Sequence, residues 1–543
     1  MIDKLLNLEE LNKATGQNYF FTFSKIDNVH LQSPSLIKLK NSDERKFHFN
    51  KLEELIEDNL YVEKIELNDT GFINLNLDIL EILKYLQKSK SEVIDLIRDE
   101  NPKEYVFDYG GPNIGKSMHV GHLRPLNIGR ALYNMYSISG NKTTSDIHLG
   151  DWGAPIAQIL SYCYDNNIKI PEVSVDQLQS IYPKASSMTA KDSEFKNKVD
   201  LNLSMLNKKD KSIFNDWKII SATTIKSVKK ILSKLNHSFD FFYGESTVID
   251  LIPEMIADLK KNNLVAVDDG ALISTQDNEP PILILKRDGT YLYMTTDLAT
   301  VLDREKSISP DFYFYVVDSR QSEHFKQLFS SVEYFNFSDA KFEHIGFGTI
   351  NDSEGKPFKT RKGDVYPLEG LWDDIFNILS EKNNSDTAHI LTNSVLVFSD
   401  LVIDRRSNYK FDINKFTNVE GKTAIYLQYS RVRIKSILKN AKATKYLDVT
   451  SEDSISNTEV NLIISILKFS DIFERAKKLN EPHHLAEYLY EVCQKFNTMY
   501  KDIKILGDDV IGIQNRRLNI LITTLTIIDL VFEILGIQTV DKM

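Results

Sequence analysis

Cysteine is almost absent from this sequence: only Cys163 and Cys493 occur among its 543 residues. Two cysteines cannot build a disulfide framework or a cysteine-rich zinc cluster. Such scarcity is typical of proteins that work in a reducing compartment, so we expect a cytoplasmic protein.

The sequence also lacks an uninterrupted apolar segment long enough to span a bilayer. Its most hydrophobic stretch, Leu518–Leu535, is interrupted by Asn519, Asp529 and Glu533. The apolar residues of this stretch keep the 3-4 spacing of a helix that buries one face, which predicts a bundle helix. The N-terminal residues MIDKLLNLEELNKATG lack a basic segment followed by an apolar one, which argues against a signal peptide. We therefore expect no membrane partner.

Positive charge is in deficit, because the formal net charge is −11. A field of that sign repels phosphates, so a nucleic-acid partner would need a local basic surface. The chain is too long for one hydrophobic core and contains no internal repeat, so we expect about three domains.

The sequence pattern divides the chain into three parts. Residues 1–100 have the pattern of a small α+β module. Residues 101–415 alternate apolar runs with amphipathic segments, as α/β domains do, and a lysine-rich helical insertion interrupts them at about 165–250. Residues 416–543 show only helical patterns, which predict an all-α bundle.

Short apolar runs predict the strands of the α/β part. The candidate strands are Tyr105–Asp108, Pro281–Lys286, Asp311–Val317 and Glu343–Gly348.

The segment GFINLNL, Gly71–Leu77, alternates strictly between apolar and other residues. Its three aliphatic residues are expected to face a core, while Phe72 and Asn74 share the opposite face. An aromatic ring and an amide on that face would suit RNA bases. The alternative is a plain edge strand of a small sheet. A helix is expected before it, over Leu52–Leu60.

The stretch YVFDYGGPNIGKSMHVGHLRPLNIGR, Tyr105–Arg130, fits two nucleotide-binding patterns. In the first, Gly110–Ser117 matches the P-loop pattern G-x-x-x-x-G-K-[ST], which needs a strand before it and a helix that begins at its Lys-Ser pair. A P-loop NTPase would also need a magnesium-binding acid at the end of a strand, and the segment Phe312–Asp318 offers one.

The second pattern is H-x-G-H, from His119 to His122. Two histidines three residues apart share one face near a helix N-terminus, whose partial positive charge attracts ATP phosphates. The imidazoles would donate hydrogen bonds to the α-phosphate as negative charge builds there. Gly121 has no side chain, so an adenine ring could approach the backbone. A zinc site is disfavoured because no third ligand lies nearby in sequence.

Further segments decide between the two patterns. The segments DYGGPNIGKSMHVGHLRPLNIGRAL and HLGDWG resemble the arginyl-tRNA synthetases of class I. So do DGTYLYMTTDLA, VVDSRQSEHFKQLF, GKPFKTRKGDV, IYLQYSRVRIKSIL and the tail segment YEVCQKFNTMY. These motifs occur in the order of the family and extend over nearly the full length, which favours H-x-G-H over the P-loop.

The resemblance implies a fold and a reaction. The fold would be α/β: a Rossmann-like class I core with an N-terminal α+β module that binds tRNA and a C-terminal all-α bundle that binds the anticodon. The reaction would join L-arginine to tRNA-Arg through an arginyl-adenylate, with ATP as substrate accompanied by Mg²⁺. The family is usually monomeric and binds tRNA before the adenylate forms. The alternatives are a P-loop NTPase and a non-catalytic RNA-binding relative.

The resemblance also implies which residues act on ATP. The catalytic residues would include His119, His122 and Lys116, the last matching a lysine thought to compensate for a degenerate phosphate loop. That loop, the family's counterpart of KMSKS, matches Phe358–Gly363, FKTRKG. Its cations suit the departing pyrophosphate. Arg361 and Lys362 are both candidates for its second lysine, and Lys359 and Gly121 are the expected ATP contacts.

For the amino acid, Tyr293 and Asp297 match the family's Tyr-x-x-x-Asp, in which the acid receives the guanidinium and the ring flanks it. A carboxylate pairs bidentately with a guanidinium, which lysine cannot reproduce. Asp108 and Asn113 match positions that hold the α-amino and carboxylate groups, and Gln321 matches a further contact. From spacing alone, the alternative is an acid at a helix N-terminus beside a core tyrosine.

For the tRNA, a helix expected over residues 420–441 places Arg431, Lys435 and Lys439 four residues apart, on a basic stripe. Such a stripe suits an RNA backbone, although an ordinary solvated helix face gives the same pattern. The resemblance implies tRNA contacts at Phe72, Asn74, Arg431, Arg433 and Lys435.

Overall fold

The computed structural model describes residues 2–275, 281–287, 289–352, 354–356, 366–449, 455–507 and 510–543. The chain forms two compact units. One is Asp99–Thr417, and the other combines Met1–Arg98 with Asn418–Met543. The three-part domain division read from the sequence stays a prediction.

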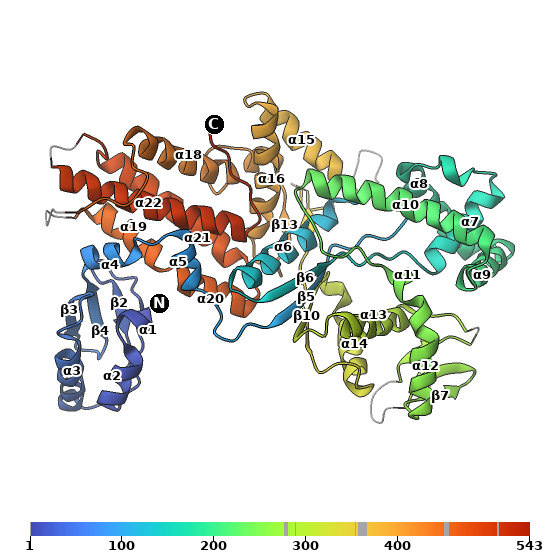
Figure 1. Cartoon of the computed structure of the whole chain (residues 1–543), viewed down its shortest axis with the longest axis horizontal. Helices are drawn as coiled ribbons and strands as arrows, with labels where there is room; N and C mark the ends of the chain where they lie inside the picture. The colour runs from blue at the N-terminus through green and yellow to red at the C-terminus, as the bar shows by residue number, and fades with distance from the viewer. Residues whose placement is uncertain are drawn as a thin grey trace. The chain divides into compact units, whose positions relative to one another are not determined.

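The centre of the unit Asp99–Thr417 is a four-stranded parallel sheet with strand order β11-β10-β5-β6 (Figure 1). The helix α6 connects β5 to β6 and packs against both strands. The bounds are β5 (Glu104–Tyr109), α6 (Leu123–Ile138), β6 (Lys142–Asp146), β10 (Phe312–Val316) and β11 (Lys341–His344). The strands predicted over Tyr105–Asp108 and Asp311–Val317 are confirmed.

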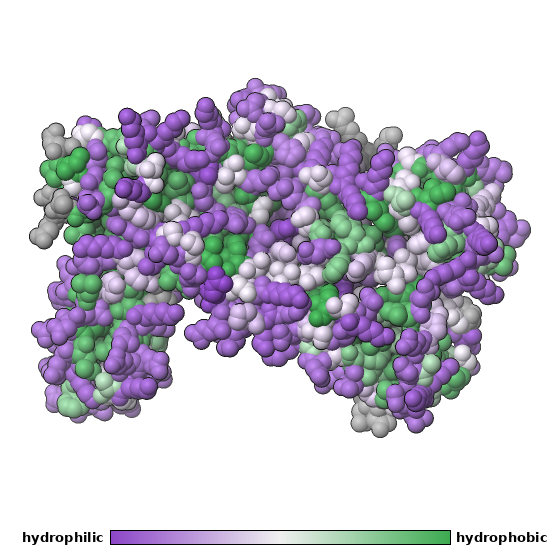
Figure 2. Space-filling view, in the orientation of Figure 1, coloured by the Kyte–Doolittle hydropathy of each residue, from purple (hydrophilic) through white to green (hydrophobic). Residues whose placement is uncertain are grey.

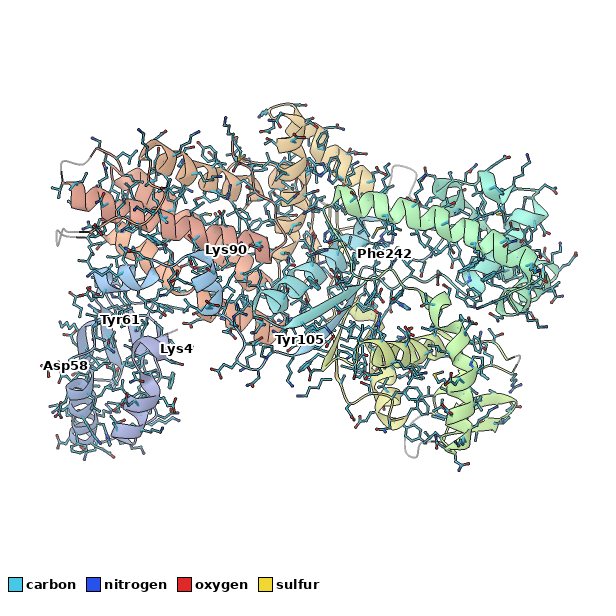
Figure 3. The ribbon with its side chains drawn as sticks, viewed as in Figure 1. Lys4, Asp58, Tyr61, Lys90, Tyr105 and Phe242 are labelled. Atoms are coloured by element: carbon cyan, nitrogen blue, oxygen red, sulfur yellow. The ribbon has the colours of Figure 1, made fainter. Side chains whose placement is uncertain are left out.

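Aromatic side chains hold the two central strands together. The ring of Tyr105 in β5, labelled in Figure 3, stacks on Phe312 in β10 with ring centroids 4.7 Å apart. Phe107 is fully buried and meets Phe314 edge to face at 5.3 Å. Such continuous burial is typical of parallel strands that are covered on both faces, and it fixes where their carboxyl ends lie.

One strand was missed and two strand predictions need correction. β6 was not predicted, because its sequence KTTSD is polar. It is stabilised by pairing with β5 and by hydrogen bonds that Ser145 donates to the Asp240 carboxylate. The predicted strand Glu343–Gly348 is misplaced, because β11 ends at His344. Pro281–Lys286 does contain a strand, β9 (Leu283–Leu285), but it belongs to a separate antiparallel sheet, β7-β8-β9.

Helices occupy most of the stretch predicted as an insertion. The remaining elements of this unit are listed here: η1 (Val120–His122), α7 (Ala154–Asp165), η2 (Ile170–Glu172), α8 (Val175–Lys191), α9 (Ser193–Asn207), α10 (Lys211–Lys234), α11 (Glu245–Val248), η3 (Ile249–Leu251), α12 (Ile252–Lys261), β7 (Val265–Asp268), β8 (Ala271–Ser274), α13 (Tyr293–Ser307), η4 (Ser319–Gln321), α14 (Ser322–Tyr334), β12 (Ile350–Asn351), α15 (Leu368–Ser380), α16 (Ser385–Leu401), β13 (Tyr409–Lys410) and α17 (Ile413–Phe416).

In the other unit, the N-terminal segment forms a four-stranded antiparallel sheet with order β1-β2-β4-β3. The predicted alternation is confirmed, because Ile73, Leu75 and Leu77 of β4 are fully buried. β4 pairs on both sides, so the alternative of an edge strand is wrong. The helix expected over Leu52–Leu60 begins much earlier, where Asn41 caps α3. The bounds are α1 (Ile2–Leu5), α2 (Leu8–Thr15), β1 (Thr22–Phe23), β2 (Leu31–Ser33), α3 (Ser42–Ile56), β3 (Val62–Leu67), β4 (Ile73–Leu77), α4 (Ile79–Leu86) and α5 (Lys90–Asp95).

The described elements of the C-terminal segment are all helices. The predicted bundle helix is confirmed as α22, most of whose apolar residues are buried. α4 packs on α19, and Lys90 of α5 (Figure 3) forms an ion pair with Glu533 of α22. The bounds are α18 (Ala424–Asn440), α19 (Asn457–Leu467), α20 (Phe469–Leu479), α21 (His483–Asp502) and α22 (Ile511–Ile534).

Hydrophilic side chains dominate the face of the protein visible in Figure 2. Throughout the described part of the chain, no helix has the length and apolar character that crossing a bilayer requires.

Candidate active site

A cavity of about 730 Å³ opens where β5 and β10 end. Parallel α/β sheets bind their ligands at this edge, because the loops that follow the strands converge there. Eight residues predicted from separate motifs line the cavity: Asp108, Asn113, His119, Gly121, His122, Tyr293, Asp297 and Gln321.

The two histidines of H-x-G-H lie side by side, with ring centroids 4.1 Å apart. They do not sit inside a regular α-helix as expected: His119 caps the 3₁₀ turn η1, and α6 begins only at Leu123. The backbone N–H of Gly121 donates to His119 Nδ1 at 3.1 Å, and the His119 N–H donates to His122 Nδ1 at 3.1 Å. A ring whose Nδ1 accepts carries its proton on Nε2, so His119 offers an Nε2–H donor. His122 Nδ1 also lies 3.3 Å from the His119 carbonyl oxygen, but its shorter contact with the His119 N–H favours the same tautomer.

The environment keeps both imidazoles neutral. Burial lowers the pKa of His122 to about 3. Burial also lowers the pKa of His119, and the positive charge of Lys116 adds to the effect. The pair can therefore donate hydrogen bonds to a phosphate at physiological pH without bringing positive charge of its own.

Two glycines that line the cavity, Gly111 and Gly121, lie close to groups from other residues. A Cβ on Gly121 would lie 2.8 Å from His119 Cε1, so the absence of a side chain there leaves space for the His119 ring; the ATP contact of Gly121 stays a prediction. A Cβ on Gly111 would lie 1.8 Å from the His148 carbonyl oxygen, so the chain can cross there only with glycine.

Lys116 does not line the cavity. Its Nζ lies 4.2 Å from the centre of the Tyr182 ring of α8, and burial lowers its pKa. No helix begins at Lys116 and Ser117, because the segment up to His119 is irregular and α6 starts at Leu123. The P-loop interpretation is therefore wrong, since it requires a helix at that pair.

Tyr293 and Asp297 also line the cavity: Tyr293 begins α13 and Asp297 follows one turn later. The Tyr293 side chain is 61% exposed, so the alternative of a core tyrosine is wrong. His324 Nε2 lies 2.6 Å from Asp297 Oδ2, and this contact raises the pKa of His324. His324 thus occupies one oxygen of the carboxylate expected to receive a guanidinium.

Glu245, at the start of α11, was not predicted. Only 8% of the residue is exposed, yet it lines the cavity. Burial, together with the nearby negative charge of Asp297, raises the pKa of Glu245 to about 8, so the group is protonated in the empty site at neutral pH. The only signal in the sequence was a lone acid after the aromatic run FDFFYG.

Arg304, another missed residue, lies between two carboxylates. Its Nη2 donates to Asp108 Oδ2 at 2.7 Å and to Asp146 Oδ2 at 2.6 Å. These acids face each other in register at the ends of β5 and β6. Burial raises the pKa of Asp108, and Arg304 opposes that rise. A spacing of seven residues from Asp297 on α13, which puts both on one helix face, could have indicated Arg304.

Asn113 and Gln321 reach the cavity from loops. Asn113 bridges to Gly150, and a Cβ on Gly150 would lie 2.2 Å from the Asn113 side-chain oxygen. Gln321 ends the turn η4, which begins directly after the cap Asp318. The Asp318 carboxylate accepts two bonds from Arg320, at 2.9 and 2.7 Å.

The predicted phosphate loop cannot be placed. Lys359, Arg361 and Lys362 lie outside the described residues.

In the other unit, the predicted basic stripe on α18 is wrong for Arg431. Only 5% of this residue is exposed; its guanidinium pairs with Asp529 and donates to the Val540 carbonyl at 2.8 Å. Lys435 pairs with Asp541. Two of the predicted stripe residues on α18 therefore pair with acids near the C-terminus of the chain, Asp529 and Asp541.

Arg433 has different surroundings. Its guanidinium lies 4.6 Å from the Tyr429 ring and 4.7 Å from the Tyr500 ring, and it donates to Asn497 at 2.7 Å. Both tyrosines are partly exposed, at 39% and 41%.

The two predicted tRNA contacts of the N-terminal sheet are half-buried. Phe72 directly precedes β4, and the Asn74 side-chain oxygen accepts from Gln32 Nε2 at 2.9 Å.

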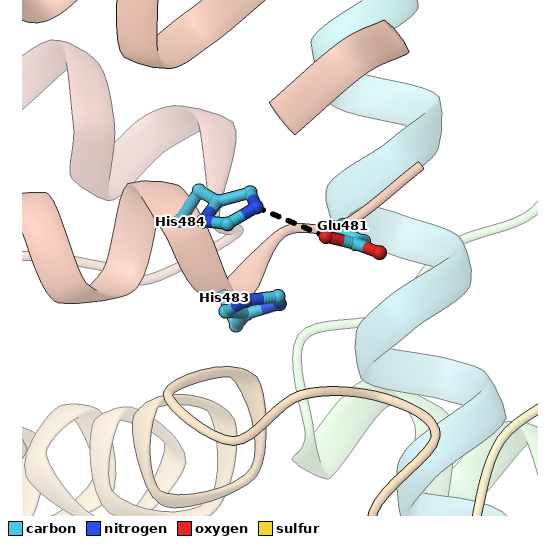
Figure 4. A group of neighbouring side chains, drawn as sticks. All are labelled: Glu481, His483 and His484. Atoms are coloured by element: carbon cyan, nitrogen blue, oxygen red, sulfur yellow. Dashed lines mark hydrogen bonds and ion pairs between the residues drawn. The ribbon is translucent and has the colours of Figure 1, made fainter. Parts of the chain in front are cut away.

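Two groups of described side chains have the composition of metal sites. In the first, Asp108, Asp146 and His148, the Arg304 guanidinium already supplies the cation between the acids. The second, shown in Figure 4, is Glu481, His483 and His484 at the start of α21, where His484 Nε2 lies 2.9 Å from Glu481 Oε2.

The sequence matches two family models. Residues 83–413 match "tRNA synthetases class I (R), catalytic domain", and residues 427–543 match "DALR anticodon binding domain". The chain is 32% identical over 518 residues to an arginine–tRNA ligase of Alkaliphilus oremlandii, covering 89% of this chain and 88% of that protein. It is also 32% identical over 513 residues to the arginine–tRNA ligase of Francisella tularensis subsp. novicida, covering 88% of each.

Solved structures agree with these matches. The arginyl-tRNA synthetase of Plasmodium falciparum superposes with a TM-score of 0.80 at 25% identity, covering 100% of this chain and 98% of that one. The Thermus thermophilus arginyl-tRNA synthetase gives 0.77 at 18% identity, covering 100% of this chain and 99% of that one, and so supports the fold. The predicted fold class is confirmed: an α/β class I core with a helical C-terminal domain.

Proposed function

This chain belongs to the arginyl-tRNA synthetases of class I, and we propose from that premise how its own residues carry out the reaction. It is an arginine–tRNA ligase. ATP and L-arginine give an arginyl-adenylate and pyrophosphate, and tRNA-Arg then takes the arginyl group and releases AMP.

One observation carries the site assignment: eight residues from motifs far apart in the sequence line a single cavity. The two neutral imidazoles and the carboxyl groups of Asp297 and Glu245 all line this cavity. The first pair suits a phosphate and the second suits a cation, so the cavity fits an ATP phosphate beside an arginine side chain.

In the activation step, the arginine carboxylate attacks the α-phosphorus of ATP and pyrophosphate leaves. Negative charge grows on the α-phosphate oxygens in the transition state. The Nε2–H groups of His119 and His122 would donate to those oxygens, and fixed donors act most strongly where charge develops. Because the rings are held by backbone N–H groups, little reorganisation is needed.

For the amino acid, the guanidinium would pair with Asp297 and Glu245 while the Tyr293 ring flanks it. Glu245 would lose its proton when the cation arrives, since an adjacent positive charge favours the carboxylate. Asp108, held by Arg304, and Asn113 would hold the α-amino and carboxylate groups, with Gln321 as a further contact. Lysine lacks the planar fork and would leave acceptors unpaired.

The remaining ATP contacts are proposed from the family resemblance. Lys116 would turn from Tyr182 towards the phosphates, and Lys359, Arg361 and Lys362 would stabilise the departing pyrophosphate. ATP would enter as its Mg²⁺ complex, with phosphate oxygens as ligands. The described acids Asp108 and Asp146 do not fit a magnesium site, because Arg304 already pairs with both.

For the tRNA, we propose that Phe72 and Asn74 contact the elbow and that Arg433 and Lys435 lie near the anticodon arm. We do not propose Arg431 as a direct tRNA contact, because its guanidinium is buried and paired with Asp529. The protein is proposed to act as a cytoplasmic monomer.

The test is ATP–pyrophosphate exchange across the amino acids, with and without tRNA-Arg. We expect exchange with arginine alone among the amino acids, and only when tRNA is present. Asp297→Asn should raise the KM for arginine by about 10- to 100-fold, because a charged acceptor is lost. Asp303→Asn, on the same helix but outside the cavity, is the matched control. Tight tRNA binding without any exchange would instead favour a non-catalytic relative.

A further inference from the structure

A second cavity, of about 540 Å³, lies beside the active site and is not used by the proposed reaction. The two cavities share three wall residues: Glu245, Tyr293 and His324. All three belong to the guanidinium end of the site. The residues at the other end, His119, His122 and Asp108, do not line the second cavity.

The lining of the second cavity is more apolar than polar, although Lys286 and Glu323 also belong to it. It includes Trp152, Ile282, Leu283, Tyr291 and Met294. Charged groups are few, and most of the polar ones are amides and hydroxyls of uncharged side chains. A cavity of this size with apolar walls and a few polar groups is typical of a small-molecule site, and it suits an alkyl or aryl group better than a second charge.

The shared residues form the boundary between the two cavities. Tyr293 lines both cavities and remains 61% exposed, so protein atoms do not enclose its ring. His324 also lines both and holds one oxygen of Asp297. A group attached to the far end of a guanidinium would therefore point past these side chains into the second cavity.

We propose that the amino-acid site continues beyond the guanidinium, so that the second cavity takes the Nω-substituent of an alkylated arginine. The proposal rests on the proposed function, because it places the guanidinium at Asp297 and Glu245. A guanidinium has five N–H donors, and one Nω-alkyl group removes only one of them. The two carboxyl groups would keep their partners while the alkyl group leaves water.

The experiment measures competition between L-arginine and Nω-methyl-, Nω-ethyl- and Nω-propyl-L-arginine in tRNA-dependent ATP–pyrophosphate exchange. The propyl compound should compete with an inhibition constant within about tenfold of the KM for arginine. Each added methylene should tighten binding by roughly fourfold, since it is buried against apolar walls. This series needs no mutant, so a folding defect cannot obscure it.

A pair of tryptophan variants locates the binding. Gln327 lines only the second cavity, so Gln327→Trp should fill part of it. Its neighbour Lys326 on α14 is 75% exposed at the side chain and lines neither cavity. Gln327→Trp should weaken the propyl compound by at least about tenfold while the KM for arginine changes less than about twofold. Lys326→Trp should change neither value.

The outcomes separate this proposal from the function itself. If arginine supports exchange but the propyl compound fails to compete at about 100 times the KM for arginine, the site ends at the guanidinium and the proposal is overturned. Equal weakening by both tryptophan variants would also overturn it. If arginine itself supports no exchange, the proposed function fails instead.

Discussion

The active-site cavity and helix α18 were both expected to gather side chains for a substrate, yet only the cavity brings most of its predicted residues together among those that the structure describes. In the cavity, residues from separate motifs, such as His119, Tyr293 and Asp297, meet around one space. On α18, the basic residues predicted to form one stripe have separate partners: Arg431 is buried, whereas Arg433 lies between two partly exposed tyrosines.

The difference has a physical origin. The motif residues of the cavity are at the ends of strands and at helix N-termini, and the parallel sheet brings those ends to one edge. A basic residue every fourth position on a helix has no such constraint. It can face water, or it can pair with an acid from a neighbouring segment, and the spacing is identical in both cases.

Removing one imidazole from the cavity should have the largest effect. His122→Ala should lower the aminoacylation rate by about 100- to 1000-fold, because one fixed donor to the transition-state oxygens is lost. His122→Asn should recover part of the rate, since an amide can still donate. Initial rates at saturating tRNA measure the effect, and an unchanged melting temperature excludes unfolding. A rate equal to wild type would remove the histidine from the mechanism.

The next largest effect should be structural and should come from Arg431. Arg431→Ala should cost about 2 kcal/mol, because Asp529 loses its partner inside the bundle. The melting temperature of the unit that contains the bundle should fall by about 5 °C. Thermal unfolding monitored by circular dichroism measures this change. Lys439→Ala, an exposed position on the same helix, is the control and should be neutral. If the Arg431 variant were as stable as wild type but bound tRNA more weakly, the prediction that Arg431 belongs to a tRNA-binding stripe would be correct.

The pH dependence of arginine binding should reveal Glu245. Its pKa of about 8 means that at pH 6.5 the empty site holds a proton that the incoming guanidinium must displace. The KM for arginine should therefore fall roughly tenfold between pH 6.5 and 8 and then level off. The raised pKa of His324 acts in the same direction, because deprotonation frees Asp297. Glu245→Gln should raise the KM and flatten most of this dependence; an unaltered profile would contradict the assignment.

The smallest effect should come from Arg433 on α18. Arg433→Ala should leave the melting temperature within about 1 °C of wild type and weaken tRNA-Arg severalfold. If Arg433 contacts a phosphate, the slope of log affinity against log salt should become shallower by about 0.7. Titration of tRNA at several salt concentrations measures this. If Arg431→Ala lost more tRNA affinity than Arg433→Ala while both variants were equally stable, Arg431 would be the tRNA contact and Arg433 would not.

Much of the site could be predicted because the motif residues are separated by characteristic spacings. His119 and His122 could be recognised in this way, as could Tyr293 and Asp297. Glu245 and Arg304 were missed, because each depends on groups far away in sequence: Glu245 on burial beside Asp297, and Arg304 on Asp108 and Asp146. A single acid or base in a sequence gives no measure of its burial.

The fold shows the same division. Apolar strands such as β5 and β10 were predicted because two-sided burial demands continuous hydrophobic runs. β6 was missed because its threonines and serine carry no such run, and its place depends on pairing with β5 and on Asp240. β9 was predicted as a strand, but the sequence could not tell that it joins a different sheet.

By itself the sequence determined the family, the α/β core with its helical C-terminal segment, and the residues whose spacing reflects chemistry. Only the tertiary structure decided which charges meet: Arg304 with Asp108, His324 with Asp297, and Arg431 with Asp529. The reason is that spacing along one segment is a local property, whereas charge pairing and burial depend on which segments the fold brings together.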